Sequence, residues 1–286
     1  MRYQFIRDHH KEFSVQRMCQ ILEVTRSGYY AWKPEQVGMR EMENRILVEQ
    51  IHAEYKISRK TYGSPRIHIS LKRKGYSCGR HRVARLMRKE GIRPQPRRRW
   101  HPVTTQRELG AIPAPNRLSQ DFSVSLVNQK WASDFTYVDT AEGWLYLAVV
   151  LDLFSRKVIG WAMAERMNTA LVERALDMAI QTRRPSSTLL HHSDQGSQYT
   201  SASYQEKLRH ANIQASMSRV GNCYDNAVVE SFFATLKSEC ITCQFTTHAM
   251  AHTTIFEYIE AWYNRKRLHS TLGYLSPVEF EQQHGH

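Results

Sequence analysis

The sequence has few cysteines and no long apolar segment. Its five cysteines in 286 residues do not indicate a disulfide framework. No run of about 18 uncharged apolar residues occurs, which argues against a membrane-spanning helix. The first ten residues lack the apolar core of a signal peptide. These absences predict a cytoplasmic protein with reduced thiols and no membrane partner.

Acidic residues are scarce in the first third of the chain. Residues 1–100 carry 24 Lys or Arg and 9 Asp or Glu, whereas residues 101–286 carry 16 and 18. The whole net charge of +13 therefore originates in the N-terminal part. Such a concentration of positive charge is typical of proteins that bind a polyanion, above all DNA. A merely solvated basic surface is the alternative.

Residues 1–40 are predicted to form a helix-turn-helix-like segment. Ser14 suits the N-cap of a helix whose apolar face includes Met18 and Ile21. A turn and a short helix over residues 26–33 complete the pattern. Such helix pairs are typical of DNA-binding motifs, although a plain helical hairpin gives the same pattern.

A second basic block, residues 43–93, is predicted to be a helical DNA-binding domain. Pro65 suits the first turn of a helix that ends at Gly75. A further helix over residues 77–90 ends at Gly91 and carries a row of arginines. The predicted DNA contacts of this block are Arg66, Arg80, Arg82 and Arg85. A solvated basic face is again the alternative.

Residues 94–128 are predicted to be a linker, because prolines recur and no apolar periodicity is present. From residue 129 the pattern changes to three strands, a helix, a strand, a helix, a strand and a helix. This is the order of the α/β ribonuclease H-like fold. We therefore expect an all-α region, followed over residues 129–286 by a ribonuclease H-like core with a C-terminal helical extension.

Three acidic residues of this core stand in different contexts. Asp134 lies within the first predicted strand, Asp194 ends the fourth, and Glu230 lies on the last helix of the pattern. Between Asp194 and Glu230 there are 35 residues, as in the Asp, Asp, 35, Glu arrangement of polynucleotidyl transferases. A lone acid is more often a surface carboxylate or a helix cap. Three acids in these contexts predict a catalytic, metal-binding set.

The predicted chemistry follows from the needs of phosphodiester transfer, which requires an activated nucleophile and neutralisation of charge at phosphorus. Two Mg²⁺ ions, or Mn²⁺ in their place, supply both when they lie about 3.5–4 Å apart. These ions prefer hard oxygen ligands. We expect Asp134 to bridge both ions, and Asp194 and Glu230 to hold one each.

Further DNA contacts are predicted on the last helix of the core and near the C-terminus. Lys237 follows Glu230 by seven residues and Asn226 precedes it by four, so both share its helical face. Arg265 and Arg267 lie in a basic segment for which DNA contact and a structural role are equally open.

Cys240 and Cys243, followed by His248 and His252, have a spacing similar to that of zinc sites. A zinc site needs a free loop to wrap the metal, and these cysteines follow directly on a predicted helix. Zinc is therefore not predicted.

The core resembles the integrase-core transposases of bacterial insertion sequences, specifically the insertion-sequence-three group, with a retroviral integrase-type fold. The basic helical block also resembles the DNA-binding domain of that family. The matching stretches are Trp131 to Tyr137, Glu142 to Trp161, His192 to Tyr199, Gly221 to Lys237 and Tyr263 to Pro277.

The resemblance implies a second-frame transposase that nicks the ends of its element and joins the exposed 3′-hydroxyls to DNA. Asp134, Asp194 and Glu230 would then be the catalytic triad. The implied partners are the terminal inverted repeats, target DNA, further copies of the chain, and an upstream-frame product or frameshift fusion. A nucleoid-associated bacterial protein is expected. The alternatives are a metal-dependent nuclease and a DNA-binding regulator on the same fold.

Overall fold

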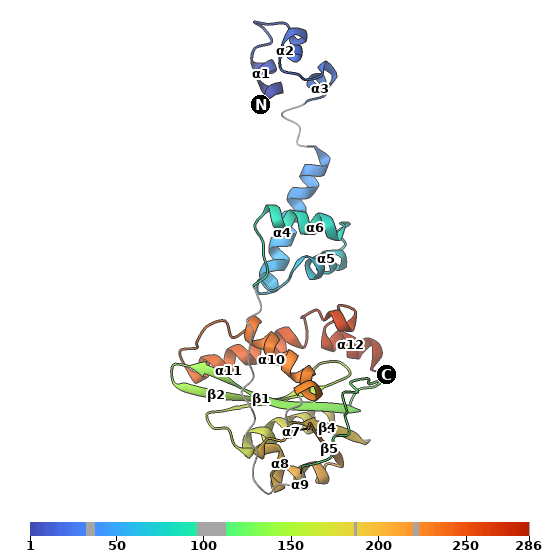
Figure 1. Cartoon of the computed structure of the whole chain (residues 1–286), viewed down its shortest axis with the longest axis vertical. Coiled ribbons are helices and arrows are strands. Elements are labelled where there is room, and N and C mark those ends of the chain that lie inside the picture. Colours follow the sequence, from blue (N-terminus) through green and yellow to red (C-terminus); the bar gives the residue numbers. More distant parts are fainter. Residues whose placement is uncertain (33–37, 96–112, 186–187, 220–222, 286) are drawn as a thin grey trace.

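The computed structural model describes residues 1–32, 38–95, 113–185, 188–219 and 223–285 (Figure 1). The helices of the N-terminal part are α1 (Arg2–Asp8), α2 (Val15–Ile21), α3 (Arg26–Ala31), α4 (Met39–Ile57), α5 (Ser64–Arg73) and α6 (Arg80–Lys89). The strands are β1 (Lys130–Thr140), β2 (Gly143–Asp152), β3 (Val158–Ala164), β4 (Leu189–Ser193) and β5 (Ile213–Met217). The later helices are α7 (Thr169–Arg183), α8 (Ser197–Thr200), α9 (Ala202–His210), α10 (Ala227–Glu239), α11 (His248–Phe256) and α12 (Pro277–His284). The short helices η1 (Cys223–Asn226) and η3 (Ser270–Leu272) and the π-helix η2 (Glu257–Tyr263) complete the chain.

Helices α1 to α3 pack around a small cluster of their own. Ile6, Met18 and Cys19 are buried in it. The Ser14 side chain accepts a hydrogen bond from the backbone N–H of Arg17, so its predicted N-cap role is confirmed. Ile21, predicted to share the apolar face, is 73% exposed. That prediction is wrong. Ile21 is the last residue of α2, and the cluster shared with α1 and α3 contains Met18 and Cys19, with Val15 and Leu22 packed against it.

Helices α4 to α6 form the basic block. Pro65 stands in the first turn of α5, as predicted. Gly75 and Gly91, which follow α5 and α6, have φ angles of +85° and +67°, a conformation that glycine adopts without the steric cost of a Cβ. The apolar side chains of α6 turn inward: Val83, Leu86 and Met87 are buried.

A mixed five-stranded sheet with the order β3-β2-β1-β4-β5 forms the core. β1 and β3 both run antiparallel to β2. β4 lies parallel to β1, and β5 parallel to β4. The strands predicted from the sequence are present in this sheet, and the predicted ribonuclease H-like fold is confirmed.

Helices cover both faces of the sheet. In Figure 1, α10 and α11 lie on one side of it and α7, α8 and α9 on the other. Strand β2 serves both layers because successive side chains point to opposite faces. Leu147 and Val149 pack on the side of α10, while Ala148 and Val150 pack on the side of α7.

The close approach of α7 to β3 requires a glycine. A Cβ placed on Gly160 would lie 2.2 Å from the carbonyl oxygen of Ala175 and 2.7 Å from the backbone nitrogen of Ala179. Neither backbone atom can move without displacing the helix. The absence of a side chain at residue 160 therefore fixes how closely this layer packs on the sheet.

The segment that precedes β1 is packed against the core. Residues 96–112 of the predicted linker lie outside the described residues. In the described remainder, Leu118 is buried, and its N–H and that of Arg117 donate to the Ser216 hydroxyl at 3.2 and 2.9 Å. The prediction of a linker that does not pack against the core is therefore wrong from residue 113 onward. The high proline content of this segment gave no sign that Leu118 would be buried.

The basic block docks on the C-terminal extension of the core. Tyr62 is buried, and its hydroxyl accepts a hydrogen bond of 2.7 Å from the N–H of Leu268. Its ring lies 5.8 Å from that of Trp262, and Arg73 forms an ion pair of 3.2 Å with Glu279. Among the helices of the described residues, none is long and apolar enough to cross a membrane.

Candidate active site

Strand pairing brings Asp134 and Asp194 to the same level of the sheet. In the parallel ladder of β1 and β4, Ala132 lies opposite His192. Asp134 stands two residues further along β1, and Asp194 directly follows Ser193, the last residue of β4. Because neighbouring strands are about 4.8 Å apart, the two aspartates occupy adjacent positions where β4 ends. The sequence could not show this register, because the two residues are 60 positions apart.

Glu230 reaches the site from the first turn of α10. This helix packs against β1, and Asn226, just before it, donates its amide to the carbonyl oxygen of Ser133 at 3.4 Å. The hydrogen bond holds the start of α10 beside the residue that precedes Asp134. Glu230 itself is exposed.

The three carboxylates influence one another through space. Burial raises the pKa of Asp134 well above its usual range, and the charges of Asp194 and Glu230 raise it further. The N–H of Phe135 and the ammonium group of Lys237 oppose this rise. Partial burial also raises the pKa of Glu230. The site is therefore a concentration of negative charge that a cation stabilises.

Lys237 lies beside this cluster, as its spacing from Glu230 predicted. Its ammonium nitrogen is 4.8 Å from the centre of the Tyr137 ring. Burial lowers the pKa of Lys237 to about 8, although the charge of Asp134 acts in the opposite direction. The ammonium group of Lys237 is therefore near enough to Asp134 for the two charges to act on each other.

The donor set suits a divalent cation of the Mg²⁺ type. Within the described ranges, no group of three or more His, Cys, Asp or Glu side chains is gathered closely enough to hold a metal ion. Mg²⁺ is usually held by only one or two carboxylates, with water and substrate phosphates as its other ligands. Asp134 and Asp194 supply such a pair, and Glu230 is near enough for its charge to act on Asp134.

Buried aromatic and imidazole groups lie near the two aspartates, on Tyr199 and on strand β4. Tyr199 is buried, and burial raises the pKa of its hydroxyl well above the usual range, with Tyr204 and both aspartates adding to the effect. His191 lies 2.7 Å from the Ser133 hydroxyl, and burial lowers its pKa to about 3. The sequence patterns did not predict a role for Tyr199 at this site. The one indication in the sequence was that Tyr199 lies in the segment that follows Asp194.

Two of the arginines predicted to bind DNA instead make hydrogen bonds to side chains within the protein. Arg82 donates to the side chains of Asn44 and Glu43, in both cases at 2.9 Å, and so ties α6 to α4. Arg267 is 3% exposed and donates to both carboxylate oxygens of Glu239. Spacing along the chain could not distinguish these arginines from solvent-facing ones.

The other predicted DNA contacts are distributed over separate elements. Arg80, Arg85 and Arg265 are exposed, while Arg66 is partly buried with its guanidinium group 5.3 Å from the Tyr62 ring. Asn226 is buried and anchors α10, so its helical spacing from Glu230 does not place it on a DNA-facing surface.

The cysteine pair shows no metal geometry. Burial raises the pKa of the Cys240 thiol to about 12, and its sulfur contacts the carbonyl oxygen of Thr254 at 3.8 Å. Cys243 is exposed. His248 faces Glu165, with 3.6 Å between Nδ1 and the carboxylate.

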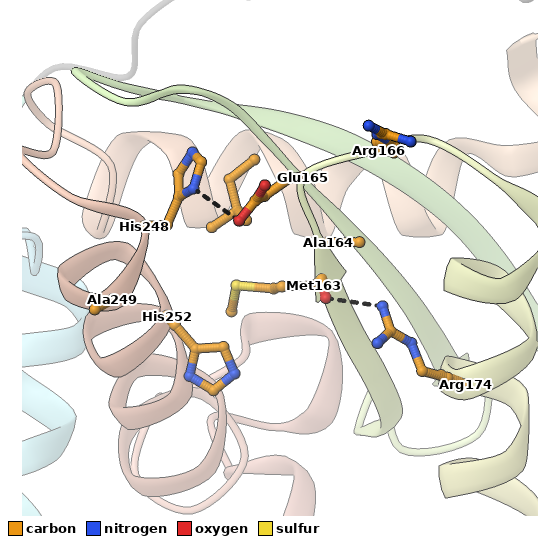
Figure 2. Close-up of a pocket in the computed structure, with 9 residues that line it drawn as sticks. Met163, Ala164, Glu165, Arg166, Arg174, His248, Ala249 and His252 are labelled. Atoms are coloured by element: carbon orange, nitrogen blue, oxygen red, sulfur yellow. Dashed lines mark hydrogen bonds and ion pairs between the residues drawn. The ribbon is translucent and has the colours of Figure 1, made fainter.

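A pocket of about 600 Å³ lies away from the three acids. Figure 2 shows His248 and His252 on one side of it, and Met163, Glu165 and Arg174 on the other. Arg174 donates to the carbonyl oxygen of Met163 at 3.0 Å, and so its guanidinium group is held at the wall. The pocket contains none of the predicted catalytic residues.

Three segments match known protein domains. An integrase core domain covers residues 125–223, an HTH-like domain residues 41–100, and a second integrase core domain residues 230–284. The first and third of these matches contain the three acids, and the second coincides with the basic block.

Curated relatives match along nearly the whole chain. Transposase InsF for insertion sequence IS3A of Escherichia coli strain K12 is 44% identical over 286 residues, with 99% of both chains covered. The insertion element IS600 uncharacterized 31 kDa protein of Shigella sonnei is 41% identical over 268 residues, which are 93% of this chain and 98% of the relative. The solved HTLV-2 integrase catalytic core domain in complex with magnesium matches 56% of this chain and 98% of its own, with 19% identity and a TM-score of 0.43.

Proposed function

The chain belongs to the IS3 family of insertion-sequence transposases, and we propose that Asp134, Asp194 and Glu230 form its catalytic, metal-binding triad. As a transposase with an integrase catalytic core, it is a polynucleotidyl transferase that acts in DNA transposition.

The pairing of β1 with β4 is the observation that carries the assignment. It sets Asp134 level with Asp194, while the hydrogen bond from Asn226 to Ser133 holds the start of the Glu230 helix at the same strand. Asp134 and Asp194, which are far apart in the sequence, thereby occupy adjacent positions at the end of β4, and the charge of Glu230 acts on Asp134. Mg²⁺, or Mn²⁺, is the cation that suits this set.

The residues of the site have separate tasks in the proposed reaction. Asp134, Asp194 and Glu230 would hold the divalent ions, with Asp134 on the central strand as the residue that both ions would share. The ions would supply polarisation of the phosphate and activation of the attacking oxygen. Lys237 contacts the phosphate beside them. Water attacks first and frees a 3′-hydroxyl at the element end, and that hydroxyl then attacks target DNA. In each step one P–O bond forms as another breaks.

DNA contact is proposed for the exposed arginines Arg80, Arg85 and Arg265. Arg80 and Arg85 belong to the HTH-like domain, whose charge draws the terminal repeats of the element. Two element ends must be held together during transposition, so we propose a homo-oligomer at the bacterial nucleoid. An upstream-frame product, separate or fused by frameshifting, is a further proposed partner.

The first experiment measures Mg²⁺- or Mn²⁺-dependent cleavage and strand transfer on the DNA that flanks the gene. The wild type is compared with Glu230→Gln, and DNA binding is measured in parallel. Loss of at least about a hundredfold in both reactions, roughly 2.7 kcal/mol in barrier, with binding retained, is the expected result.

Glu206→Gln on α9 is the matched control, because it removes the same charge from an exposed side chain. Equal activity of Glu230→Gln and the wild type would refute the triad. A wild type that cleaves without joining ends would favour the nuclease alternative. A wild type that binds DNA but is inactive even when fused to the upstream frame would favour the regulator.

A further inference from the structure

A pocket of about 310 Å³ lies between the basic block and the core. Arg66 of α5 contributes one wall, and Arg156, from the turn between β2 and β3, contributes another. The remaining walls come from α10 and from the segment around His269 and Ser270. None of the three catalytic acids lines it. The pocket therefore joins parts of the chain that are separate in sequence and belong to different domains.

Positive charge converges on this pocket. Burial lowers the pKa of His269 to about 2, and the charges of Arg267, Arg66 and Arg156 lower it further. Arg267 is neutralised by its two-pronged ion pair with Glu239. With the Arg267–Glu239 pair neutral overall, the guanidinium groups of Arg66 and Arg156 are the positive charges that line this partly desolvated space.

The guanidinium group of Arg156 has a nitrogen that lacks a hydrogen-bond acceptor in the described part of the chain. Its Nη1 nitrogen is buried and has no hydrogen-bond partner within the described residues. Burial lowers its pKa, against the opposing charges of Tyr263 and Asp152. A buried cationic nitrogen without an acceptor is costly, since it has lost water and gained nothing in exchange. The backbone of Arg156 is fixed separately, because its carbonyl oxygen accepts a hydrogen bond of 3.0 Å from the Tyr263 hydroxyl.

The side chains that line the pocket favour a ligand with a negative charge and hydrogen-bond acceptors. Arginines and hydroxyl groups donate hydrogen bonds, and Ser270 and Thr271 supply hydroxyls at the exposed rim. A phosphodiester brings a negative charge and several acceptor oxygens, which suit a planar guanidinium group. We propose that this pocket binds a backbone phosphate of the DNA on which the transposase acts. This inference rests on the proposed DNA contact of the HTH-like domain and core.

The position of α10 relates this phosphate to the reaction. Ala227, Ser231 and Thr235 line the pocket at intervals of four residues and so share one face of the helix. Glu230 and Lys237 lie on a different face. A DNA strand bound at both places would pass around α10, with one phosphate at the metal site and another in the pocket. Because Arg66 comes from the HTH-like domain, the same phosphate would also hold that domain to the core.

The test is DNA affinity as a function of salt concentration, measured without divalent metal on the full chain. Short duplexes from either side of the gene and an unrelated duplex are the probes. We expect Arg156→Gln to weaken binding several-fold on both kinds of duplex. The slope of log affinity against log salt should fall by about 0.9, the value for one lost phosphate contact on duplex DNA. Ser270→Asp, which adds a negative charge at the rim, should weaken binding further.

Arg209→Gln is the matched control, because it removes an equal charge from an exposed arginine on α9. It should leave the salt slope unchanged. If Arg156→Gln and Ser270→Asp both keep the wild-type affinity and slope, the pocket does not bind DNA. A lower melting temperature of Arg156→Gln with an unchanged slope would assign Arg156 a structural role and also overturn the proposal.

The outcome is independent of catalysis. Binding that depends on Arg156, in a protein that neither cleaves nor joins DNA even when fused to the upstream frame, would support the pocket and count against the catalytic assignment. Normal Mg²⁺-dependent activity, together with an Arg156→Gln variant that binds DNA as the wild type does, would support the catalytic assignment and overturn the phosphate pocket.

Discussion

Single arginines in this protein differ in role according to their burial and their partners. Arg267 is buried against Glu239, which also accepts a hydrogen bond of 2.9 Å from the Tyr258 hydroxyl. Burial alone would raise the pKa of Glu239, but the hydrogen bonds and charge of Arg267, with that of Tyr258, lower it overall. Such a pair is strongly destabilised when one partner is removed, because the other stays buried and charged.

Glu239→Gln is therefore expected to reduce the free energy of unfolding by about 3–5 kcal/mol. The reason is that the Arg267 guanidinium group would lose its counter-charge without regaining water. Urea unfolding measures the change. Glu41→Gln, which breaks an exposed pair with Lys89, should cost less than about 1 kcal/mol. Equal effects of the two substitutions would contradict the structural role of Arg267.

Glu281 gives the stability of the core a dependence on pH. Burial would raise its pKa, but hydrogen bonds from Arg183 and Ser155 and the charges of Arg183 and Lys157 lower it overall. A carboxyl group whose pKa is lower in the folded state stabilises the fold above its unfolded pKa of about 4.3. That contribution is lost as the pH falls through the folded value.

We expect urea unfolding to show falling stability below about pH 4.3, with part of the slope absent in Glu281→Gln. The variant should also be less stable than the wild type at neutral pH, since Arg183 would lose its carboxylate partner. A variant with the full acid-dependent slope of the wild type would show that Glu281 is not one of the groups responsible.

At the scale of elements, helix α6 carries residues that pack against the neighbouring helices and others that are exposed to solvent. Its apolar residues face α4 and α5, and Arg82, at the border, binds the side chains of Asn44 and Glu43. Arg85 is exposed. The two arginines are three residues apart and are therefore neighbours on the helix surface, but Arg82 is the one that lies beside Asn44 and Glu43 of α4.

A matched pair of variants tests this division. Arg85→Gln is expected to weaken DNA binding several-fold and lower the salt slope by about 0.9, with an unchanged melting temperature. Arg82→Gln is expected to lower the melting temperature by several degrees, which corresponds to roughly 1 kcal/mol, because α6 loses its polar tie to α4. Salt-dependent binding titrations and thermal unfolding measure the two effects. The reverse pattern would mean that α6 presents Arg82 to DNA.

At the scale of the whole molecule, the HTH-like domain and the core are joined by a specific contact. Tyr62 inserts between the domains, and burial raises the pKa of its hydroxyl to about 12. That hydroxyl is the acceptor for the N–H of Leu268, a few residues after the π-helix η2. The DNA-binding and catalytic parts are therefore held in one relative position by a buried hydrogen bond, a ring contact and the ion pair of Arg73.

Tyr62→Phe is expected to loosen this contact, because the N–H of Leu268 would remain buried without its acceptor. The expected cost is about 1–3 kcal/mol, and amide hydrogen exchange at Leu268 should accelerate accordingly. Tyr30→Phe, at an exposed position, is the control and should change neither stability nor exchange. Unchanged exchange at Leu268 in the Tyr62 variant would show that the hydrogen bond does not hold the domains together.

Much of the architecture follows from local sequence patterns. The apolar run of β2, the periodic apolar residues of α7 and the glycines after α5 and α6 are local signals, and each gave the element that the structure contains. The three acids were found in the same way, because each has its own strand or helix context. Their roles as ligands stay a prediction that Glu230→Gln tests.

The sequence by itself determined the order of elements, the basic N-terminal third and the identity of the three acids, because these depend on neighbours along the chain. Only the tertiary structure decided that Asp134 stands level with Asp194, that Arg82 and Arg267 face carboxylates, and that Arg66 and Arg156 share a pocket. These facts depend on strand register and on the docking of distant segments. Register and docking are set by the packing of the whole core, which no local pattern encodes.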